Sequence, residues 1–329
     1  MTEPLYVGLD VGGTSMKAGV VDNAGKALAS VSLPTEAHRG QEIGLEHMCE
    51  AIRQAVAAAG LKLGDISAIG VATPGTMDIP AGVILDPPNL KPWRNVPVRD
   101  HIHKVFKLPT AFQNDANAAA LGEFWAGAGK DVHSMVLFTL GTGVGGGIII
   151  GDLVLEGEHS HGAEVGHMKI EMTKPRQCGC GRWGCLEAYA SATSVVKRAT
   201  EALSQKGADS QLQALGNKEG GLTARDIFDA ASAGDSLADK IVEETAYYLA
   251  VGAMNMMHTI DPAMVVFGGG MTAAGEPFLK RIQQFVKELA FPVPAQKTKI
   301  CYAQLGSDAG FIGAAASGRK LFLRKDKKS

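Results

Sequence analysis

Two stretches of this chain share one order of elements: an apolar strand, a glycine-rich turn and a second apolar strand. The first consists of Leu5–Asp10, Gly12-Gly13 and Lys17–Asp22, and the second consists of Met135–Leu140, Gly141–Gly147 and Ile148–Ile150. Short apolar runs predict the strands, and glycine permits the tight turns between them. We interpret the recurrence as a weak internal repeat.

The rest of the chain alternates short strands with amphipathic helices, which predicts an α/β protein. Strands are expected at Ala27–Leu33, Ile69–Ala72, Thr110–Gln113 and Ala263–Phe267. Helices are expected at Glu42–Ala59, Ala116–Ala126, Leu186–Ala202, Ser236–Met257 and Pro277–Leu289, with a last helix from near Asp308. A chain of 329 residues predicts roughly two domains.

Charge and cysteine content exclude several classes of protein. The 32 Lys and Arg residues nearly balance the 34 Asp and Glu residues, so no overall basic surface for nucleic acid is expected. No apolar run reaches the ~18 residues of a membrane-spanning helix, and no leader sequence is apparent. The five cysteines are an odd number and partly clustered, which is typical of a reducing compartment. We therefore expect a cytoplasmic protein with no membrane or nucleic-acid partner.

Both glycine-rich segments have the composition of phosphate-binding loops, because glycine lets backbone N–H groups approach phosphate oxygens. The candidate nucleotide contacts are Asp10, Gly12, Gly13, Thr14, Lys17, Gly141, Thr142, Gly143, Gly268, Gly269 and Gly270. Asp10 is placed to hold Mg²⁺ through water, and Lys17 either reaches phosphate or lies on an exposed strand face. One such loop alone is as well explained by a tight hairpin.

Two other nucleotide-binding motifs fit less well. Neither loop has the spacing of a P-loop. The second loop contains Gly-x-Gly-x-x-Gly at Gly141, Gly143 and Gly146, but strand-like Ile148–Ile150 follows it. A dinucleotide-binding fingerprint requires a helix at that point, so a dehydrogenase is disfavoured.

A cysteine cluster follows in the second half of the chain. Cys178, Cys180 and Cys185 have the spacing Cys-x-Cys-x4-Cys, and His167 precedes them. Three thiolates and one imidazole form a closed tetrahedral Zn²⁺ site, which is a structural rather than a hydrolytic centre. A redox switch and buried free thiols are the alternatives.

Three carboxylates are candidates for chemistry. Asp115 lies where a strand becomes a helix, and its alternative role is to cap that helix. Its functional interpretation is a general base for a sugar hydroxyl, since phosphoryl transfer needs an aligned hydroxyl and an orienting carboxylate. Glu164 and Glu187 flank the metal segment and are candidates to accept hydrogen bonds from sugar hydroxyls.

Together these segments resemble the ROK family, which comprises repressors, uncharacterised frames and sugar kinases. The resemblance rests on Gly8–Thr14, on Gly141–Gly147, and on Gly162–His167 followed by Cys178–Glu187, and it covers nearly the whole chain. It implies an α/β, two-domain actin-like ATPase (ribonuclease H-like) fold with a cleft between the domains. The small domain would be 1–120, completed by about 308–329, and the large domain with the zinc segment would be 121–307.

The resemblance also implies roles for single residues. ATP with Mg²⁺ would be the donor and a hexose the acceptor, with Asp115 as the base for the sugar 6-hydroxyl. The implied sugar contacts are Gly75, Asn89, Asn114, Asp115, Glu164, His167 and Glu187. The implied zinc ligands are His167, Cys178, Cys180 and Cys185, so that His167 would serve both zinc and sugar, with one ring nitrogen each. The Gly268–Gly270 segment would lie on the adenosine side, and a homodimer is what the family suggests.

Within the family, Cys178–Thr193 is most similar to the bacterial glucokinase branch. We therefore expect glucose as the acceptor and glucose 6-phosphate as the product. N-acetylglucosamine, N-acetylmannosamine and other hexoses remain alternatives, because their kinases share most of these residues. A sugar-responsive regulator is disfavoured, since the first phosphate motif begins within ten residues of Met1 and leaves no room for a helix-turn-helix domain.

Overall fold

A computed structural model describes residues 3–205, 210–216 and 220–326 of the chain. These residues form two compact units. The first unit comprises residues 1–133, 147–163 and 304–329, and the second comprises 134–146 and 164–303. The expected functional domains, 1–120 with 308–329 and 121–307, stay a prediction. No helix in the described part of the chain is long and apolar enough to cross a membrane.

The first unit is built on a five-stranded sheet with the order β3-β2-β1-β4-β7. Its strands are β1 (Leu5–Val11), β2 (Ser15–Val21), β3 (Ala27–Pro34), β4 (Ile66–Thr73) and β7 (Thr110–Asn114). Antiparallel pairing joins β1, β2 and β3, whereas β4 pairs in parallel with β1 and β7. A small hairpin, β5 (Thr76–Asp78) and β6 (Val83–Asp86), follows β4.

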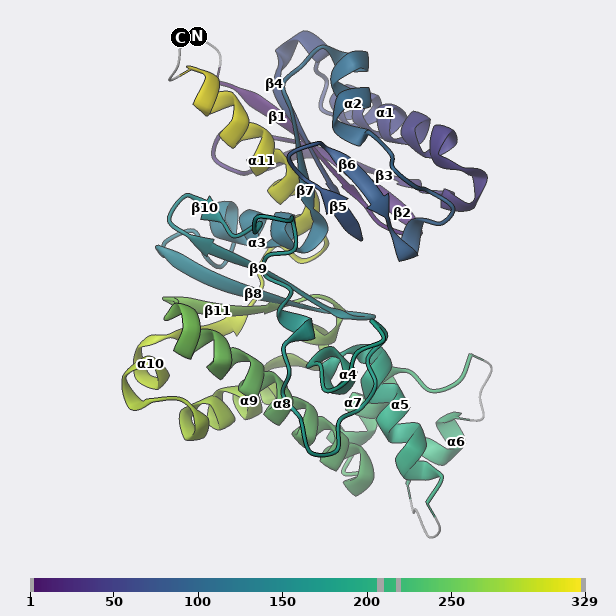
Figure 1. Cartoon of the computed structure of the whole chain (residues 1–329), viewed down its shortest axis with the longest axis vertical. Coiled ribbons are helices and arrows are strands. Elements are labelled where there is room, and N and C mark those ends of the chain that lie inside the picture. The colour runs from purple at the N-terminus through teal and green to yellow at the C-terminus, as the bar shows by residue number, and fades with distance from the viewer. Residues whose placement is uncertain (1–2, 206–209, 217–219, 327–329) are drawn as a thin grey trace. The chain divides into compact units, whose positions relative to one another are not determined.

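Helices cover both faces of this sheet, with α1 (Gln41–Ala58) and α2 (Val98–Phe106) on one face and α11 (Ala309–Asp326) on the other (Figure 1). Side chains alternate along β1, so Val7, Leu9 and Val11 belong to the core that contains α1, whereas Tyr6 packs with α11. Glycine allows α11 to approach closely, because a Cβ at Gly8 would lie 1.7 Å from the carbonyl oxygen of Phe311. The helix α3 (Asp115–Ala126) packs against α11.

The second unit contains most of a second five-stranded sheet, whose order is β10-β9-β8-β11-β12. Its strands are β8 (Ser134–Leu140), β9 (Val144–Ile150), β10 (Leu153–Val154), β11 (Met264–Gly268) and β12 (Lys299–Tyr302). The strand order matches that of the first sheet. In each sheet the first strand, β1 or β8, has its hairpin partner on one side and two parallel strands on the other side. The weak internal repeat is therefore confirmed.

Helices α8 (Ser236–Ile260) and α9 (Gly275–Leu289) pack side by side in the second unit (Figure 1). The long α8 also contacts three shorter helices, which are α4 (Glu187–Ala190), α5 (Ala192–Leu203) and α7 (Ala224–Ser232). The remaining short helices are α6 (Leu212–Gly216) and α10 (Pro292–Lys297).

Two expected elements differ from the structure. The helix expected at Leu186–Ala202 is two helices, because Ser191 has an extended backbone and caps α5 by accepting a hydrogen bond from the N–H of Ser194. The strand expected at Ile148–Ile150 begins earlier, at Val144, so the second glycine-rich turn comprises only Gly141–Gly143. A strand rather than a helix therefore follows the glycine turn, which disfavours a dinucleotide-binding fold.

Candidate functional site

The first glycine loop, Gly12–Thr14, connects β1 to β2 and is held from both sides. The N–H of Gly12 donates to the carbonyl of Ser15 at 2.9 Å, which closes the turn. Thr35 donates its hydroxyl to the carbonyl of Gly12 at 2.7 Å and its N–H to the carbonyl of Thr14 at 2.9 Å. A Cβ at Gly13 would lie 3.0 Å from the carbonyl oxygen of Asn89. The loop thus lies against one of the predicted sugar contacts.

Asp10 is near the end of β1, and the alternation of the strand directs it to the same face as α11. A Cβ at Gly310, in the first turn of α11, would lie 2.1 Å from Oδ2 of Asp10. Glycine at this position therefore makes room for the carboxylate. Burial, and to a smaller extent the negative charge of Asp115, raise the pKa of Asp10 to about 7 against the opposing effect of Lys17.

The interaction between Asp10 and Asp115 brings together two predicted functional residues from distant parts of the first unit. The raised pKa indicates that the positive charge near Asp10 does not balance its burial and the neighbouring carboxylate. Lys17 supplies part of this charge, but its Nζ also pairs with Asp308, at 2.5 Å from Oδ1, and lies 3.3 Å from the hydroxyl of Ser307. A divalent cation would supply the missing charge.

Asp115 is the first residue of α3, and Asn114 caps that helix. The side-chain oxygen of Asn114 accepts hydrogen bonds from the N–H groups of Ala116 at 2.9 Å and Asn117 at 3.1 Å. The alternative interpretation of Asp115 as the N-cap is therefore wrong. Oδ1 of Asp115 lies 2.8 Å from the N–H of Ala116, and the cap does not require this carboxylate.

Gln113 holds the strand-to-helix junction, a role that the sequence pattern did not predict. Its Nε2 donates to Oε1 of Glu156 at 2.7 Å, and its Oε1 accepts the N–H of Asn114 at 2.8 Å. Gln113 is 3% exposed. A glutamine at the end of an expected strand, directly before an Asn-Asp pair, was the available sequence signal for such a role.

Gly75 and Asn89, the other predicted sugar contacts of the first unit, lie near the β5–β6 hairpin. Gly75 has a φ of +91°, and a Cβ there would lie 2.7 Å from Cα of Pro87. Both the positive φ and the close approach of Pro87 therefore favour glycine at this position. Asn89 lies in a short 3-10 turn, Pro88–Leu90, just after Pro87.

In the second unit, the second glycine loop lies beside Gly269. Gly269 has a φ of +88°, and a Cβ there would lie 2.5 Å from the carbonyl oxygen of Leu140. Gly268 ends β11, and Gly270 begins a 3-10 turn. Because Leu140 directly precedes Gly141, the structure brings the predicted phosphate segment and the predicted adenosine segment together.

The four predicted zinc ligands also come together in the second unit. One ligand atom from each of His167, Cys178, Cys180 and Cys185 lies within 4.8 Å of all the others. Sγ of Cys178 is 3.8 Å from Nδ1 of His167, and Sγ of Cys180 is 3.9 Å from Sγ of Cys185. A tetrahedral zinc site with Zn–S bonds of about 2.3 Å places its sulfur atoms about 3.8 Å apart, so the cluster fits a zinc ion.

Glu187 and Glu164 flank this cluster. The carboxylate of Glu187 bridges two features: Oε1 lies 3.2 Å from Sγ of Cys178, and Oε2 accepts the N–H of Val144 at 3.0 Å. Glu164 directly precedes the 3-10 turn Val165–His167, and its carbonyl accepts the N–H of His167 at 3.0 Å.

Comparisons with known proteins identify the family of this chain. The family model described as "ROK family" matches residues 6–320. A glucokinase from Halalkalibacterium halodurans is 38% identical over 95% of this chain and 94% of its own length. A ROK hexokinase from Thermus thermophilus has a TM-score of 0.83 at 33% identity, covering 99% of this chain and 100% of that one. A ROK family glucokinase from Streptomyces griseus, solved with glucose and AMPPNP, has a TM-score of 0.77 at 34% identity, covering 96% and 99%.

Proposed function

Because this chain belongs to the ROK family, we propose that it is an ATP-dependent glucokinase that converts glucose and ATP to glucose 6-phosphate and ADP. Its α/β fold is the actin-like ATPase fold of the ROK sugar kinases. The observation that carries the proposal is the pair of carboxylates in the first unit. Asp10 and Asp115 interact next to a glycine loop, and Asp115 is not needed as a helix cap.

In this proposal Asp115 acts as the general base. Its carboxylate takes the proton of the sugar 6-hydroxyl while that oxygen attacks the γ-phosphorus of ATP. The bond between the γ-phosphorus and the bridging oxygen breaks, and ADP leaves. Since the transition state is loose, the protein mainly aligns the reactants and stabilises charge. Gln113 and the Asn114 cap fix the start of α3 and thereby hold Asp115 in place.

The phosphates would be held by Gly12, Gly13, Thr14, Lys17, Gly141, Thr142 and Gly143, and the adenosine by Gly268–Gly270. Mg²⁺ would be held by Asp10, through water. The raised pKa of Asp10 supports this role, since a cation would favour its ionised form. When bound, Mg²⁺ would neutralise charge on the phosphate oxygens. Lys17 would have to exchange Asp308 for phosphate in order to contribute.

Zn²⁺ would be held by His167, Cys178, Cys180 and Cys185, as the distances among their ligand atoms support. Four protein ligands leave no open position, so the metal would be structural. Its effect would be to fix the loop that carries these residues. Lys169 lies beside this cluster, because its Nζ is 3.0 Å from Sγ of Cys185.

For the sugar, we propose hydrogen bonds with Asn89, Asn114, Glu164, His167 and Glu187, in which the two glutamates accept from sugar hydroxyls, with Gly75 leaving space for the ring. An acetamido hexose is the alternative acceptor, because it differs from glucose only at C2. A homodimer and a cytoplasmic location complete the proposal. The cytoplasmic location is supported by the cysteine content, which is five residues with three of them in the predicted metal cluster.

The test is ADP release with Mg²⁺ and ATP across glucose, mannose, fructose, allose, N-acetylglucosamine and N-acetylmannosamine. We expect the highest kcat/KM with glucose. A preference for an acetamido sugar would move the assignment to an amino-sugar kinase, and no ADP release with any hexose would contradict the proposal.

A further inference from the structure

The segment Glu187–Thr193, here called the brace, holds the second glycine loop at several points. The N–H of Ala192 donates to the carbonyl of Gly141 at 2.9 Å. The hydroxyl of Thr193 donates to the carbonyl of Thr142 at 2.9 Å. Oε2 of Glu187 accepts the N–H of Val144 at 3.0 Å. The brace therefore contacts the backbone of the loop from its first residue to the start of β9.

These contacts fix the direction of two free donors. In a planar trans peptide, the C=O of one residue and the N–H of the next point in opposite directions. The carbonyls of Gly141 and Thr142 point toward the brace, so the N–H groups of Thr142 and Gly143 point away from it. Across the residues that the structure describes, neither of these two N–H groups donates a hydrogen bond. Paired backbone donors of this kind suit an anion.

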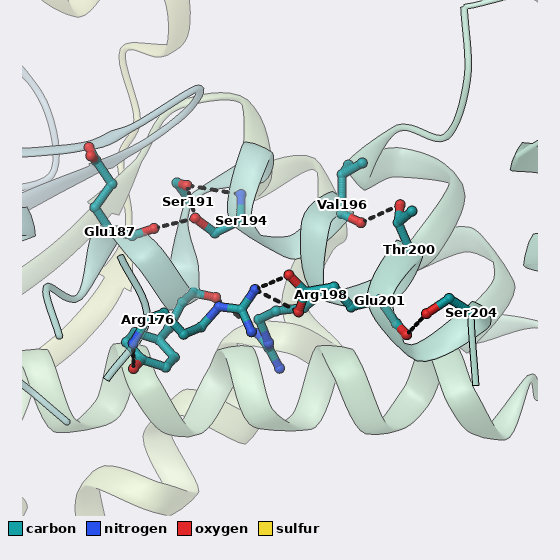
Figure 2. Close-up of polar contacts among 10 residues, drawn as sticks. Arg176, Glu187, Ser191, Ser194, Val196, Arg198, Thr200, Glu201 and Ser204 are labelled. Atoms are coloured by element: carbon teal, nitrogen blue, oxygen red, sulfur yellow. Dashed lines mark hydrogen bonds and ion pairs between the residues drawn. The ribbon is translucent and has the colours of Figure 1, made fainter. Parts of the chain in front are cut away.

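Hydrogen bonds also hold the brace itself, and Figure 2 shows those among Glu187, Ser191 and Ser194. Between α4 and α5, the hydroxyl of Ser194 donates to the carbonyl of Glu187 at 2.6 Å, and the hydroxyl of Ser191 lies 2.8 Å from that of Ser194. From below, the guanidinium of Arg198 donates to the carbonyl of Tyr189 at 2.9 Å and is only 6% exposed. Because these hydrogen bonds hold the brace, its position can determine that of the loop.

We propose that the brace aims the Thr142 and Gly143 N–H groups at the phosphates of the nucleotide, with Thr193 as a positioning residue. The inference rests on the proposed function, since it takes a nucleoside triphosphate as the ligand of the loop. Thr193 reaches the loop through its side chain alone and is exposed, so it can be changed without disturbing the core.

The test compares Thr193→Val, which removes the hydroxyl, with Thr193→Ser, which keeps it. Thr200→Val is the matched control, because Thr200 is also exposed on α5 and donates its hydroxyl to a backbone carbonyl, that of Val196, at 2.9 Å. The measurements are the Kd for a non-hydrolysable ATP analogue by calorimetry, and the KM values for ATP and glucose.

We expect Thr193→Val to raise the Kd of the analogue and the KM for ATP about three- to tenfold, as for one lost hydrogen bond. The KM for glucose should not change, and Thr193→Ser and Thr200→Val should resemble the wild type. An unchanged Kd in Thr193→Val would overturn the inference, and so would an equal rise in the glucose KM. If the wild type binds the analogue but phosphorylates no hexose, the kinase proposal fails while the Kd comparison still decides the role of Thr193.

Discussion

Replacing Asp10 with Asn should stabilise the first unit at neutral and alkaline pH. Burial and Asp115 raise the pKa of Asp10 from 3.8 to about 7. The folded state therefore keeps a proton that the unfolded state has lost between these two pH values. The contribution of Asp10 to stability falls as the pH rises through this window and is level above it.

The magnitude follows from the same shift. About three pKa units at about 1.4 kcal/mol each give an upper limit of about 4 kcal/mol for the cost of the charged carboxylate above pH 7. Part of this cost is already present at pH 5. We therefore expect the stability advantage of Asp10→Asn over the wild type to grow by about 2–3 kcal/mol between pH 5 and pH 8.

Urea unfolding followed by tryptophan fluorescence would measure this advantage without added Mg²⁺ or nucleotide. Of the three tryptophans, Trp93 and Trp125 belong to the first unit, and Trp183 belongs to the second. A Trp183→Phe background therefore makes the signal specific to the first unit. Asp131→Asn, at an exposed position of the same unit, is the control. An advantage that is equal at pH 5 and pH 8 would refute the reasoning.

Two further changes test the metal cluster and the space beside Asp10. Cys180→Ser should lose zinc and lower the temperature of thermal unfolding, as measured by metal analysis and calorimetry; a wild type purified without chelators that contains no zinc would refute this. Gly310→Ala should displace the Asp10 carboxylate, because the new Cβ would lie 2.1 Å from its Oδ2, lowering kcat at least about tenfold and stability by about 1–3 kcal/mol. Gly64→Ala, at a glycine with open space around it, is its control, and full activity in Gly310→Ala would contradict a role for the position of Asp10.

The strand–turn–strand pattern predicted much of both sheets, because alternation and glycine turns are local signals. It did not predict where the second glycine turn ends, since glycines occur both in that turn and in β9. In the strand, a Cβ at Gly146 would lie 2.7 Å from the carbonyl oxygen of Leu137. The need for glycine at position 146 comes from the neighbouring strand β8, so a local sequence pattern cannot predict it.

Serine and asparagine at helix starts were harder to interpret. Ser191 lies inside a run with helical spacing, yet it ends one helix and caps the next. Asn114 and Asp115 are both good cap residues, and only the backbone geometry assigns the cap to Asn114. The sequence therefore predicted the junction between β7 and α3 but could not assign the cap within it.

The interaction between Asp10 and Asp115 depends on strand order. β1 and β7 are separated by β4 in the sheet, and no sequence period reports that order. The grouping of the predicted zinc ligands was easier to predict, because three of the four lie within one short loop. The contacts of Lys17 with Asp308 and Ser307 were also out of reach, since they join the two ends of the chain.

The role of Asp115 is the central claim, and Asp115→Ala tests it most directly. The measurements are kcat with glucose and saturating ATP, and the Kd of glucose by calorimetry. If Asp115 is the general base, kcat should fall by about 10²–10⁴-fold, while glucose still binds within a few-fold of the wild-type Kd. A kcat close to that of the wild type would contradict the account.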